Sequence, residues 1–347
     1  MARILYGVAG EGSGHSSRAK EIINYLLKRG HEVKIVSYDR GFANLKKMMN
    51  FDVEEITGLG FAYRNNRVNY AETALKNFLM SPKLAESFYK TVKIFDKFKP
   101  HIIFSDFEPM TATVANLKKI PLISIDNQHR LTDAKTEYPK KYEMEAIAAK
   151  TVTKLMVQFA KAYLVITFFK TKSLNSRTFF FPPILREEVL KSKSKDGKYV
   201  LVYLTSPFEG LIEELKSINK RFVVYGFNIN KKEKNVIFKI ADQKGFLKDL
   251  CGCECVVANA GFTLISEALY LRKPYLAIPV KGQFEQIYNA YYLEKLGFGK
   301  YWDNLSREKI EAFLFNLDIY KKNLKKYKKE NNAKIFRKID KLIKKYV

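Results

Sequence analysis

The sequence predicts an α/β protein with two Rossmann-like, parallel-sheet domains that face each other across a cleft. Short apolar runs alternate with helical patterns in both halves of the 347 residues, which is typical of parallel sheets covered by helices. A linker-like stretch separates the halves, and each half has a turn of small or polar residues directly after an apolar strand. In such sheets, ligands bind beyond the carboxyl ends of the strands.

The elements expected in the first half follow one another in strand–helix order. Apolar runs predict strands at 3–8, 32–38, 102–106, 122–126 and 163–168. Amphipathic patterns predict helices at 16–29, 70–99, 109–118 and 142–161.

The second half repeats this order. We expect strands at 199–204, 221–227, 236–240, 255–258 and 274–280, and helices at 208–219, 262–271 and 284–296. Pro182 and Pro183 precede a Lys- and Ser-rich stretch, which indicates a linker. The expected division is a first domain at 1–182, a linker at 183–198, a second domain at 199–317 and a C-terminal helix at 318–347.

The formal net charge is +26, and much of it lies near the C-terminus. From Tyr320 to Val347, eleven Lys and one Arg accompany two carboxylates, and apolar residues recur near helical spacing. We expect a basic amphipathic helix, which packs one stripe on the protein body, lies on an anionic membrane, or does both. No recognisable DNA- or RNA-binding motif occurs, so nucleic acid is not an expected partner.

Composition also points to the cytoplasm. The chain has no apolar run of membrane-spanning length and begins directly with a strand rather than a signal sequence. The three cysteines, all between residues 251 and 255, fit buried positions better than a metal site because no second pair of ligands accompanies them.

The most informative stretch is 256–279, in which an apolar strand runs into Asn259, Ala260 and Gly261 and a helix opens at Phe262. Small residues let backbone amides approach an anion, and a helix start supplies unpaired donors and a positive dipole. Glu267, one turn further along, is within reach of sugar hydroxyls on the same ligand. The stretch predicts a site for a nucleotide with a ribose.

A glycine-rich loop, GVAGEGSGHSSR at 7–18, follows the first strand. It lacks the Gly-Lys-Ser/Thr ending of a Walker loop and the spacing of a dinucleotide fingerprint, although Asp39 keeps a nicotinamide alternative open. Gly12 and Gly14 permit close approach of an acceptor. His15 at the helix start suits a general base that points into a cleft, and a capping or packing histidine is the alternative.

Polar residues follow two further strands of the first domain. Asp106 is a candidate to orient His15 and stabilise its cation, or else to cap the helix that starts at Pro109. Asn127, His129 and Arg130 lie beyond the next strand, where contact with an acceptor is favoured over a plain loop.

These residues together resemble the GT-B glycosyltransferases. The likeness is to the family 28 type, which contains the bacterial N-acetylglucosaminyltransferase of peptidoglycan-precursor synthesis and the plant galactolipid synthases. It also extends to an archaeal branch labelled as related to teichoic-acid synthesis. It covers most of the chain and is sharpest at ANAGFTLISEAL, KPYLAIPVKGQFEQIYNAYYLEKLG and GEGSGHSSRA.

The resemblance implies that the second domain binds a nucleotide sugar and the first an acceptor. It implies nucleotide contacts from a set that spans the second domain, namely Ser206, Gly245, Phe246, Ala260, Gly261, Thr263 and Glu267. It implies donor-sugar contacts from Glu285, Gln286 and Asn289. Two departures are a Thr-Ser-Pro-Phe turn at 205–208 in place of a second glycine-rich loop, and Asn259 where a basic residue is common.

The resemblance implies inverting transfer of a sugar from a nucleoside diphosphate sugar, with uridine as the expected nucleoside. The expected acceptor is a hydroxyl of a lipid-linked or cell-envelope molecule at the inner face of the membrane. No Asp-x-Asp motif occurs, so neither a metal nor another cofactor is expected. The residues between 61 and 99 are a second candidate membrane surface, and a basic amphipathic helical surface is the alternative. The apolar side chains in question are Phe78, Leu79, Met80, Phe88 and Phe95, which lie among many basic residues. Two alternatives are a UDP-sugar 2-epimerase and a non-catalytic polyanion-binding protein.

Overall fold

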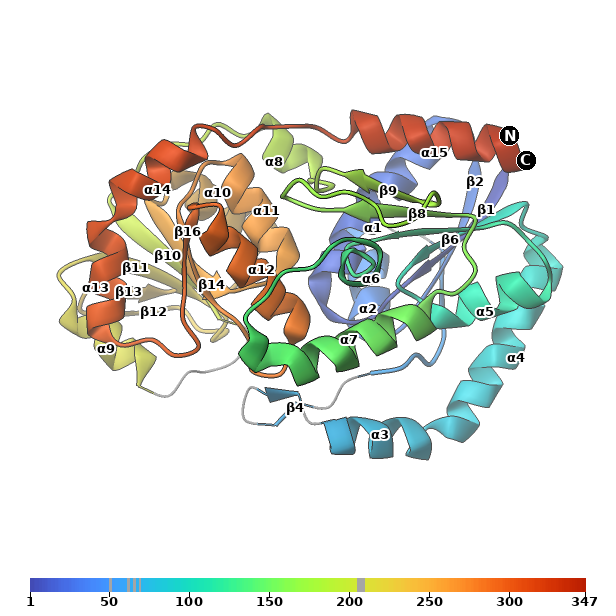
Figure 1. The fold of residues 1–347 in the computed structure, drawn as a ribbon, viewed down its shortest axis with the longest axis horizontal. Helices are drawn as coiled ribbons and strands as arrows, with labels where there is room; N and C mark the ends of the chain where they lie inside the picture. Colours follow the sequence, from blue (N-terminus) through green and yellow to red (C-terminus); the bar gives the residue numbers. More distant parts are fainter. Residues whose placement is uncertain (50–51, 61–62, 65–66, 69, 205–209) are drawn as a thin grey trace. The chain divides into compact units, whose positions relative to one another are not determined.

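The computed structural model describes residues 1–49, 52–60, 63–64, 67–68, 70–204 and 210–347. Two compact units divide the described chain (Figure 1). The first contains residues 1–64, 68–186 and 330–347, and the second contains Arg67 and residues 187–329. The chain therefore passes from one unit to the other near Arg186 and returns near Lys329.

The first unit is built on a seven-stranded sheet in the order β3-β2-β1-β6-β7-β8-β9. Every neighbouring pair in it is parallel. The strands are β1 (Arg3–Val8), β2 (Glu32–Ser37), β3 (Val53–Glu55), β6 (Ile102–Asp106), β7 (Leu122–Asp126), β8 (Ala162–Ile166) and β9 (Thr178–Phe181). A two-stranded ribbon, β4 (Tyr63–Arg64) with β5 (Arg67–Val68), stands apart from this sheet.

The helices of the first unit connect these strands. They are α1 (Gly12–Lys28), α2 (Asp39–Met49), α3 (Tyr70–Leu79), α4 (Ser81–Phe98), α5 (Pro109–Leu117), α6 (Arg130–Asp133), α7 (Glu143–Met156), the 3-10 turn η1 (Lys140–Tyr142) and the C-terminal α15 (Ala333–Tyr346). Apolar residues of α4 and α5, such as Ile94, Phe95 and Val114, pack with Leu5 and Ile103 of the sheet. The connection from β1 to β2 through α1 and the connection from β6 to β7 through α5 run in opposite directions along the sheet. Because such connections are right-handed, α1 covers the face of the sheet opposite to the one that α5 covers.

The second unit has a similar sheet, in the order β12-β13-β11-β10-β14-β15-β16, and only the edge strand β12 is antiparallel. Its strands are β10 (Tyr199–Tyr203), β11 (Arg221–Tyr225), β12 (Lys231–Glu233), β13 (Val236–Phe238), β14 (Cys255–Asn259), β15 (Tyr275–Ile278) and β16 (Gly299–Tyr301). Its helices are α8 (Glu187–Lys191), α9 (Leu211–Ser217), α10 (Gln243–Gly252), α11 (Phe262–Tyr270), α12 (Phe284–Lys295), α13 (Arg307–Phe315) and α14 (Leu317–Leu324).

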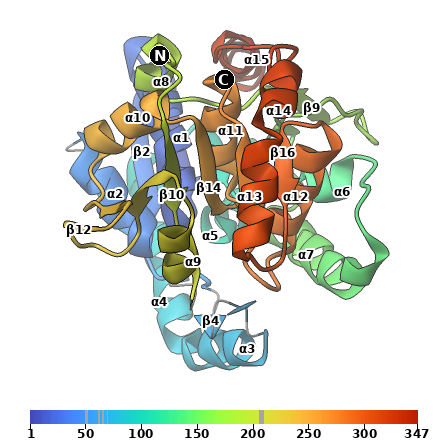
Figure 2. The same cartoon turned by 90° about the vertical axis from the view of Figure 1, so that its left-hand side faces the viewer.

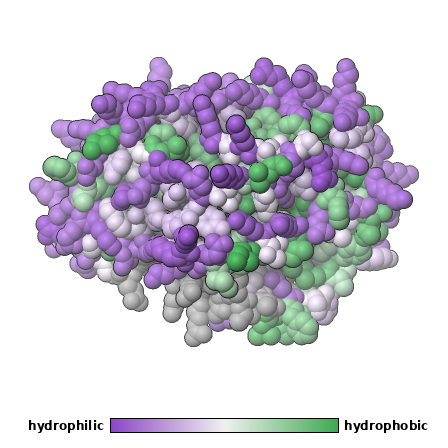
Figure 3. Space-filling model, in the orientation of Figure 1, coloured by the Kyte–Doolittle hydropathy of each residue, from purple (hydrophilic) through white to green (hydrophobic). Residues whose placement is uncertain are grey.

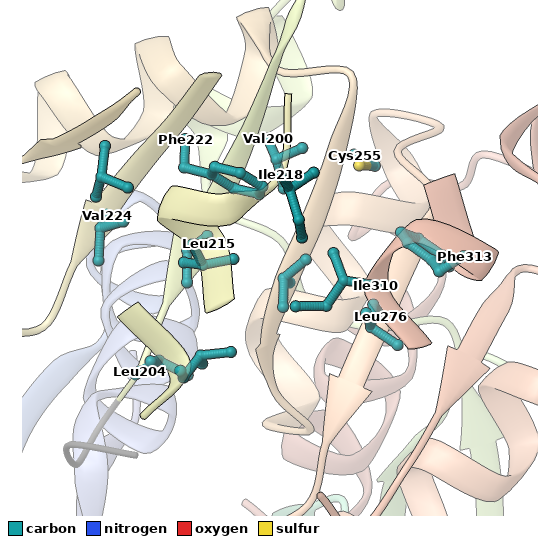
Figure 4. Close-up of a cluster of buried hydrophobic side chains, with 14 of the residues drawn as sticks. Val200, Leu204, Leu215, Ile218, Phe222, Val224, Cys255, Leu276, Ile310 and Phe313 are labelled. Carbon is teal, nitrogen blue, oxygen red and sulfur yellow. The ribbon is translucent and has the colours of Figure 1, made fainter. Parts of the chain in front are cut away.

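One core cluster shows how this sheet is covered. Leu215 of α9 and Ile310 and Phe313 of α13 pack against the buried strand residues Val200 and Leu276 (Figure 4). Figure 2 shows α9 and α13 on this side of the strands.

Cys253 and Cys255 are fully buried, and burial raises the pKa of Cys253 to about 12, so these thiols are inert packing residues.

Two predicted helices differ from the structure. The helix expected over 70–99 is two helices, α3 and α4, because Pro82 lies in the first turn of α4 and has no amide to continue a preceding helix. The helix expected over 318–347 is also two, α14 and α15, with a break at 325–332. α15 belongs to the first unit, whereas α14 belongs to the second.

α15 is anchored on the first unit by its apolar stripe and by polar contacts. Ile335, Ile339, Leu342 and Ile343 are buried. Phe336 stacks on Tyr25 of α1 at a centroid distance of 4.2 Å, and the Tyr25 hydroxyl donates to Asp340 at 2.6 Å. The packed stripe is thus one of the two forms expected for the basic tail. No helix in the described part of the chain is long and apolar enough to cross a bilayer.

Candidate active site

The strand order of the first unit reverses between β1 and β6, and ligands of open α/β sheets bind at such a point. Val8, the last residue of β1, is in register with Asp106, the last residue of β6. The loop after β1 leads directly into α1, so the first turn of α1 lies over this carboxyl edge. This connection carries His15 to Asp106.

His15 and Asp106 form a buried pair. His15 Nδ1 lies 2.7 Å from Asp106 Oδ1, and the two residues are 8% and 0% exposed. Arg18, on the same face of α1, donates from Nε to Asp106 Oδ2 at 2.5 Å, and its Nη2 contacts Oδ1. Arg18 also donates from Nη1 to Asn127 Oδ1 at 2.7 Å. Asp106 is therefore held between an imidazole and a guanidinium.

The contacts of His15 determine which ring nitrogen is available for chemistry. Nδ1 lies 2.7 Å from Arg18 Nη2 as well as 2.7 Å from the carboxylate. A guanidinium only donates, so the two contacts require different tautomers. We infer that Nδ1–H donates to Asp106, because a carboxylate is the strongest acceptor there. That tautomer leaves a lone pair on Nε2, as a proton acceptor requires.

Arg18 was not singled out from the sequence, although it follows His15 by three residues. That spacing places two side chains on one helix face, and it was the available signal. Burial alone lowers the pKa of Arg18, but the Asp106 carboxylate outweighs burial and raises it. The guanidinium thus stays charged and neutralises the buried carboxylate.

Glu108, rather than Asp106, caps the helix α5. Its carboxylate accepts from the Met110 amide at 2.8 Å and from the Thr111 amide at 2.7 Å. Burial raises the pKa of Glu108, and the hydrogen bonds from Thr111 and Met110 oppose this shift. The sequence left two roles open for Asp106, and with Glu108 at the cap the Asp106 carboxylate faces His15 and Arg18 instead.

The glycine-rich loop is partly structural. A Cβ on Gly10 would lie 2.4 Å from the Tyr38 ring, so this glycine is required for packing. Gly12 starts α1 with a φ of +68°, and a Cβ there would meet nothing within 4 Å. Gly14 is half-buried in the same turn. Gly12 and Gly14, the predicted acceptor contacts, therefore lie in the first turn of α1 together with His15.

The polar residues after β7 are buried, whereas the sequence suggested a surface that meets an acceptor. Asn127, His129 and Arg130 are 1%, 3% and 0% exposed. His129 Nδ1 lies 2.7 Å from Asp126 Oδ2. Burial lowers the pKa of His129, but the Asp126 carboxylate outweighs it and raises the value. Burial would raise the pKa of Asp126, but the interaction with His129 outweighs burial and lowers this pKa to about 2. The His129 ring is thus committed to an internal ion pair.

In the second unit the strand order reverses between β10 and β14, and the turn at 259–261 follows β14 at this point. Neighbouring side chains hold the turn through its backbone. The Tyr275 hydroxyl donates to the Asn259 carbonyl at 2.6 Å, and Asn289 Nδ2 donates to the Ala260 carbonyl at 2.8 Å. Gly261 is the N-cap of α11 and a Cβ on it would meet nothing within 4 Å. The start of α11 is therefore held in place by these hydrogen bonds, and its N-cap residue has no side chain.

Thr263 and Glu267 lie four residues apart in α11, so they share one helix face. Glu267 is 3% exposed and Thr263 is half-buried. A carboxylate one turn beyond a fixed helix start has the arrangement expected for a ribose and its phosphates.

The predicted donor-sugar residues have different surroundings. Glu285 is half-buried at the start of α12. Gln286 is turned toward its own loop, because its Oε1 accepts from the Val280 amide at 3.0 Å and its Nε2 donates to Gln283 at 2.5 Å. Asn289 is fully buried and supports the turn at Ala260. Gln286 thus contacts a backbone amide and a side chain of its own loop, and Asn289 contacts the backbone of the turn after β14.

The remaining predicted nucleotide contacts are at α10 and in the loop after β10. Asp242 caps α10 by accepting from the Gly245 amide at 2.7 Å, and the Phe246 amide donates to the Asp242 carbonyl at 3.0 Å. The Phe246 ring packs edge-on against Tyr203 and Tyr225. These amides are thus engaged within the helix start. Ser206 lies outside the described residues. Across the described residues, His, Cys, Asp and Glu side chains form no group of three that would hold a metal ion.

Comparisons with known proteins agree with this architecture. An uncharacterized glycosyltransferase of Methanosarcina acetivorans is 24% identical over 340 residues, which cover 89% of this chain and 85% of the relative. The UDP-N-acetylglucosamine--N-acetylmuramyl-(pentapeptide) pyrophosphoryl-undecaprenol N-acetylglucosamine transferase of Clostridium botulinum (strain Langeland) is 26% identical over 379 residues, covering 100% of this chain and 99% of the relative.

Solved structures share the fold. The MurG protein of Acinetobacter baumannii superposes with a TM-score of 0.63 at 16% identity, covering 99% of this chain and 100% of that one. The glycosyltransferase of kitacinnamycin superposes with a TM-score of 0.68 at 16% identity, covering 98% of both chains. The two parallel-sheet units are therefore those of a GT-B fold. Residues 2–318 match the profile of glycosyl transferase family 1, and the chain belongs to this family of enzymes.

Proposed function

We propose that this glycosyltransferase moves a sugar from a uridine diphosphate sugar to a hydroxyl of a lipid-linked acceptor, with inversion at the anomeric carbon. The name of the Clostridium botulinum relative states a UDP-linked donor and an undecaprenol-linked acceptor, and this supports both classes of substrate. The observation that carries the mechanism is the contact of 2.7 Å between His15 Nδ1 and Asp106 at the carboxyl edge of the first sheet.

In the proposed reaction, His15 Nε2 takes the proton of the acceptor hydroxyl as the oxygen attacks the anomeric carbon. The new carbon–oxygen bond forms while the bond to the diphosphate breaks, and its electron pair leaves with the nucleoside diphosphate. Asp106 stabilises the imidazolium, and Arg18 fixes the Asp106 carboxylate. A single displacement of this kind inverts the anomeric centre.

The donor half of the proposal belongs to α11. Its amides and dipole would oppose the charge that develops on the leaving diphosphate, and a preorganised helix start does this without rearrangement. Glu267 would accept hydrogen bonds from the ribose hydroxyls. Asn289 would act as a positioning residue, since it holds the Ala260 carbonyl from below the turn. Because the helix start supplies the charge stabilisation, we propose that no metal ion is needed, and transfer should be unaffected by EDTA.

We propose narrower roles for Glu285, Gln286 and the loop at 245–246 than the resemblance implies. Glu285 is the member of the donor-sugar group that we retain as a contact. Gln286 instead would shape the loop at Val280 through its two side-chain hydrogen bonds. The ring of Phe246, held edge-on by Tyr203 and Tyr225, would form an apolar wall beside the base.

A membrane location is proposed from an apolar surface on α3. Leu75, Phe78 and Leu79 are 57%, 74% and 69% exposed, and α4 follows with several lysines. Figure 3 shows this apolar surface in green at the lower edge of the view. An apolar face beside basic residues suits peripheral binding at the inner face of a membrane. Flotation with phosphatidylglycerol vesicles should be lost in a Phe78→Ser/Leu79→Ser variant, and unchanged flotation would contradict this location.

The donor proposal is tested by a thermal-shift panel of nucleoside diphosphate sugars on wild type and Glu267→Ala. A ligand that binds the native state raises the melting temperature, so UDP-sugars should stabilise wild type and stabilise Glu267→Ala much less. Stabilisation by no nucleotide sugar, or equal stabilisation of both proteins, would contradict the assignment.

The comparisons name transferases throughout, so neither the epimerase nor the polyanion-binding alternative is favoured.

A further inference from the structure

A pocket of 610 Å³ lies in the first unit between α15 and the sheet edge formed by β8 and β9. Its residues from the sheet are Phe159, Lys161 and Ala162 at the start of β8, and Ser176, Arg177 and Phe179 at the start of β9. The residues from α15 are Lys338, Lys341, Leu342, Lys345 and Tyr346. All of them belong to one compact unit.

The location separates this pocket from the candidate active site. All strands of the first sheet are parallel. The pocket lies at the amino ends of β8 and β9, whereas His15 and Asp106 lie at the carboxyl ends of β1 and β6. Parallel strands place these ends at opposite edges of a sheet, so the pocket is a different site from the one proposed to bind the acceptor hydroxyl.

The charges of the pocket are of one sign. It is lined by Lys161, Arg177, Lys338, Lys341 and Lys345, and no Asp or Glu lines it. None of these cations forms an ion pair with a residue that the structure describes. The three lysines of α15 are spaced i, i+3 and i+7, so one helix face presents them together. A cluster of like charges without counterions is unfavourable in an isolated protein, and a bound anion relieves the repulsion.

Aromatic groups add a second feature. Lys338 Nζ lies over the Phe179 ring at 3.3 Å from its centroid, which fixes this ammonium group in the pocket. Burial, together with repulsion from Lys341 and Lys345, lowers the pKa of Lys338. Phe159 is 72% exposed and Tyr346 is half-buried. The pocket thus combines a concentrated positive charge with apolar surface at its rim.

We propose that this pocket binds a phosphate-bearing anion, as a site separate from donor and acceptor. Lysine and arginine side chains bind phosphate oxygens through charge-assisted hydrogen bonds, and several converging cations select a multiply charged group. Two sources have this chemistry, namely the headgroup of an anionic lipid and a free phosphorylated metabolite. The site does not depend on the transferase mechanism.

The test compares two double variants of α15 with equal loss of charge. Lys341→Gln/Lys345→Gln removes two cations from the pocket, and Arg337→Gln/Lys344→Gln removes two exposed cations of the same helix that do not line it. All four side chains are exposed, so neither variant should disturb folding. Binding of inorganic pyrophosphate is measured by titration calorimetry, and binding to vesicles with and without phosphatidylglycerol is measured by flotation.

The pocket variant should bind pyrophosphate about tenfold more weakly than wild type, while the control variant should stay within about twofold. If the pocket variant also loses flotation with phosphatidylglycerol, the natural source is a lipid headgroup. If flotation is retained, the source is a free phosphorylated compound. Equal pyrophosphate binding and equal flotation in the two variants, or no pyrophosphate binding by wild type, would overturn the proposal. Stabilisation by nucleotide sugars should be the same in all three proteins, which separates this result from a failure of the transferase assignment.

Discussion

At the scale of single residues, the account depends on how three side chains share a buried carboxylate. Asp106 receives Arg18 on both of its oxygens and His15 on one. The guanidinium pairs with the buried carboxylate and fixes it in place as the acceptor for the imidazole. Arg18 is therefore a positioning residue, which acts on His15 through Asp106.

Replacing Arg18 tests this arrangement. The Arg18→Met variant leaves the buried carboxylate with His15 alone, and the loss of a buried partner should lower the free energy of unfolding by roughly 3 kcal/mol. It should also lower kcat, because Asp106 loses the contacts that hold it against His15, while the dissociation constant of the donor stays unchanged. A stability loss with an unchanged kcat would mean that Arg18 has a purely structural role.

The Asp126–His129 pair predicts a bell-shaped pH dependence of stability. The depressed pKa of Asp126, about 2 against an ordinary 3.8, gives stability that is lost as pH falls from about 4 toward 2. The raised pKa of His129 gives stability that is present below its ordinary value of 6.5 and is lost as pH rises through the higher, folded value. The pair should therefore contribute most between about pH 4 and pH 6.5.

Urea unfolding of wild type and His129→Asn at several pH values measures this contribution. The variant should be less stable by roughly 3 kcal/mol near pH 5.5, because it leaves a buried carboxylate without its partner. The difference should shrink toward acid and alkaline pH. A difference that is constant with pH would show that His129 acts through packing and not through its charge.

At the scale of elements, the start of α11 is the feature that the sequence predicted most fully. The expected strand, small-residue turn and helix start are all present at 255–263. What the sequence did not show is the support beneath the turn, because Tyr275 and Asn289 reach it from β15 and α12. Helical spacing indicates which face a side chain occupies, but not which backbone group lies opposite, so the contacts of Asn289 and Gln286 with their surroundings could not be predicted.

Gly261→Ala is a local test of the diphosphate position. Gly261 has a φ of −68° that any residue adopts, and an added Cβ meets nothing within 4 Å, so the fold should tolerate alanine. Loss of a favourable N-cap residue should cost only about 0.5–1 kcal/mol of stability. The new methyl group would intrude on a diphosphate at the helix start, and nucleotide affinity should fall by about tenfold or more. Unchanged affinity in titration calorimetry would place the diphosphate elsewhere.

Other elements show where sequence patterns reach their limit. The strand at 3–8 and the strands at 102–106 and 122–126 were predicted with their observed bounds, because parallel strands buried on both faces are short, mainly apolar runs. β9 was missed, since Phe179 to Phe181 directly precede two prolines and no strand was expected at the end of the first domain. Strands of two or three residues, such as β4, β5 and β12, are too short to show an alternation of apolar and polar residues in the sequence.

At the scale of the whole molecule, the chain enters the body of its second unit after Arg186 and returns to the first at Glu330. The two crossing segments are joined, because Asn332 accepts from the Leu185 amide at 3.0 Å and donates to its carbonyl at 2.8 Å. The sequence indicated the linker near 183–198 but gave no sign that the C-terminal segment returns to the first unit. An amphipathic stripe predicts burial, but it does not identify the surface that buries it.

The return of α15 predicts that the C-terminus stabilises the N-terminal unit. Ile339 is fully buried, so Ile339→Ala should lower the free energy of unfolding by about 2–4 kcal/mol. Lys344→Ala, on the exposed face of the same helix, should change it by no more than about 0.5 kcal/mol. Hydrogen exchange should show that the loss falls on β1 and α1. Exchange that is unaltered in those elements would mean that α15 is dispensable.

The most direct test of the central assignment is His15→Ala, assayed for sugar transfer and for nucleotide-sugar binding in the same preparation. If His15 is the base, kcat should fall by about 10²–10⁴-fold while the dissociation constant of the donor stays unchanged. Transfer at the wild-type rate by His15→Ala would contradict the assignment of the His15–Asp106 pair to proton removal.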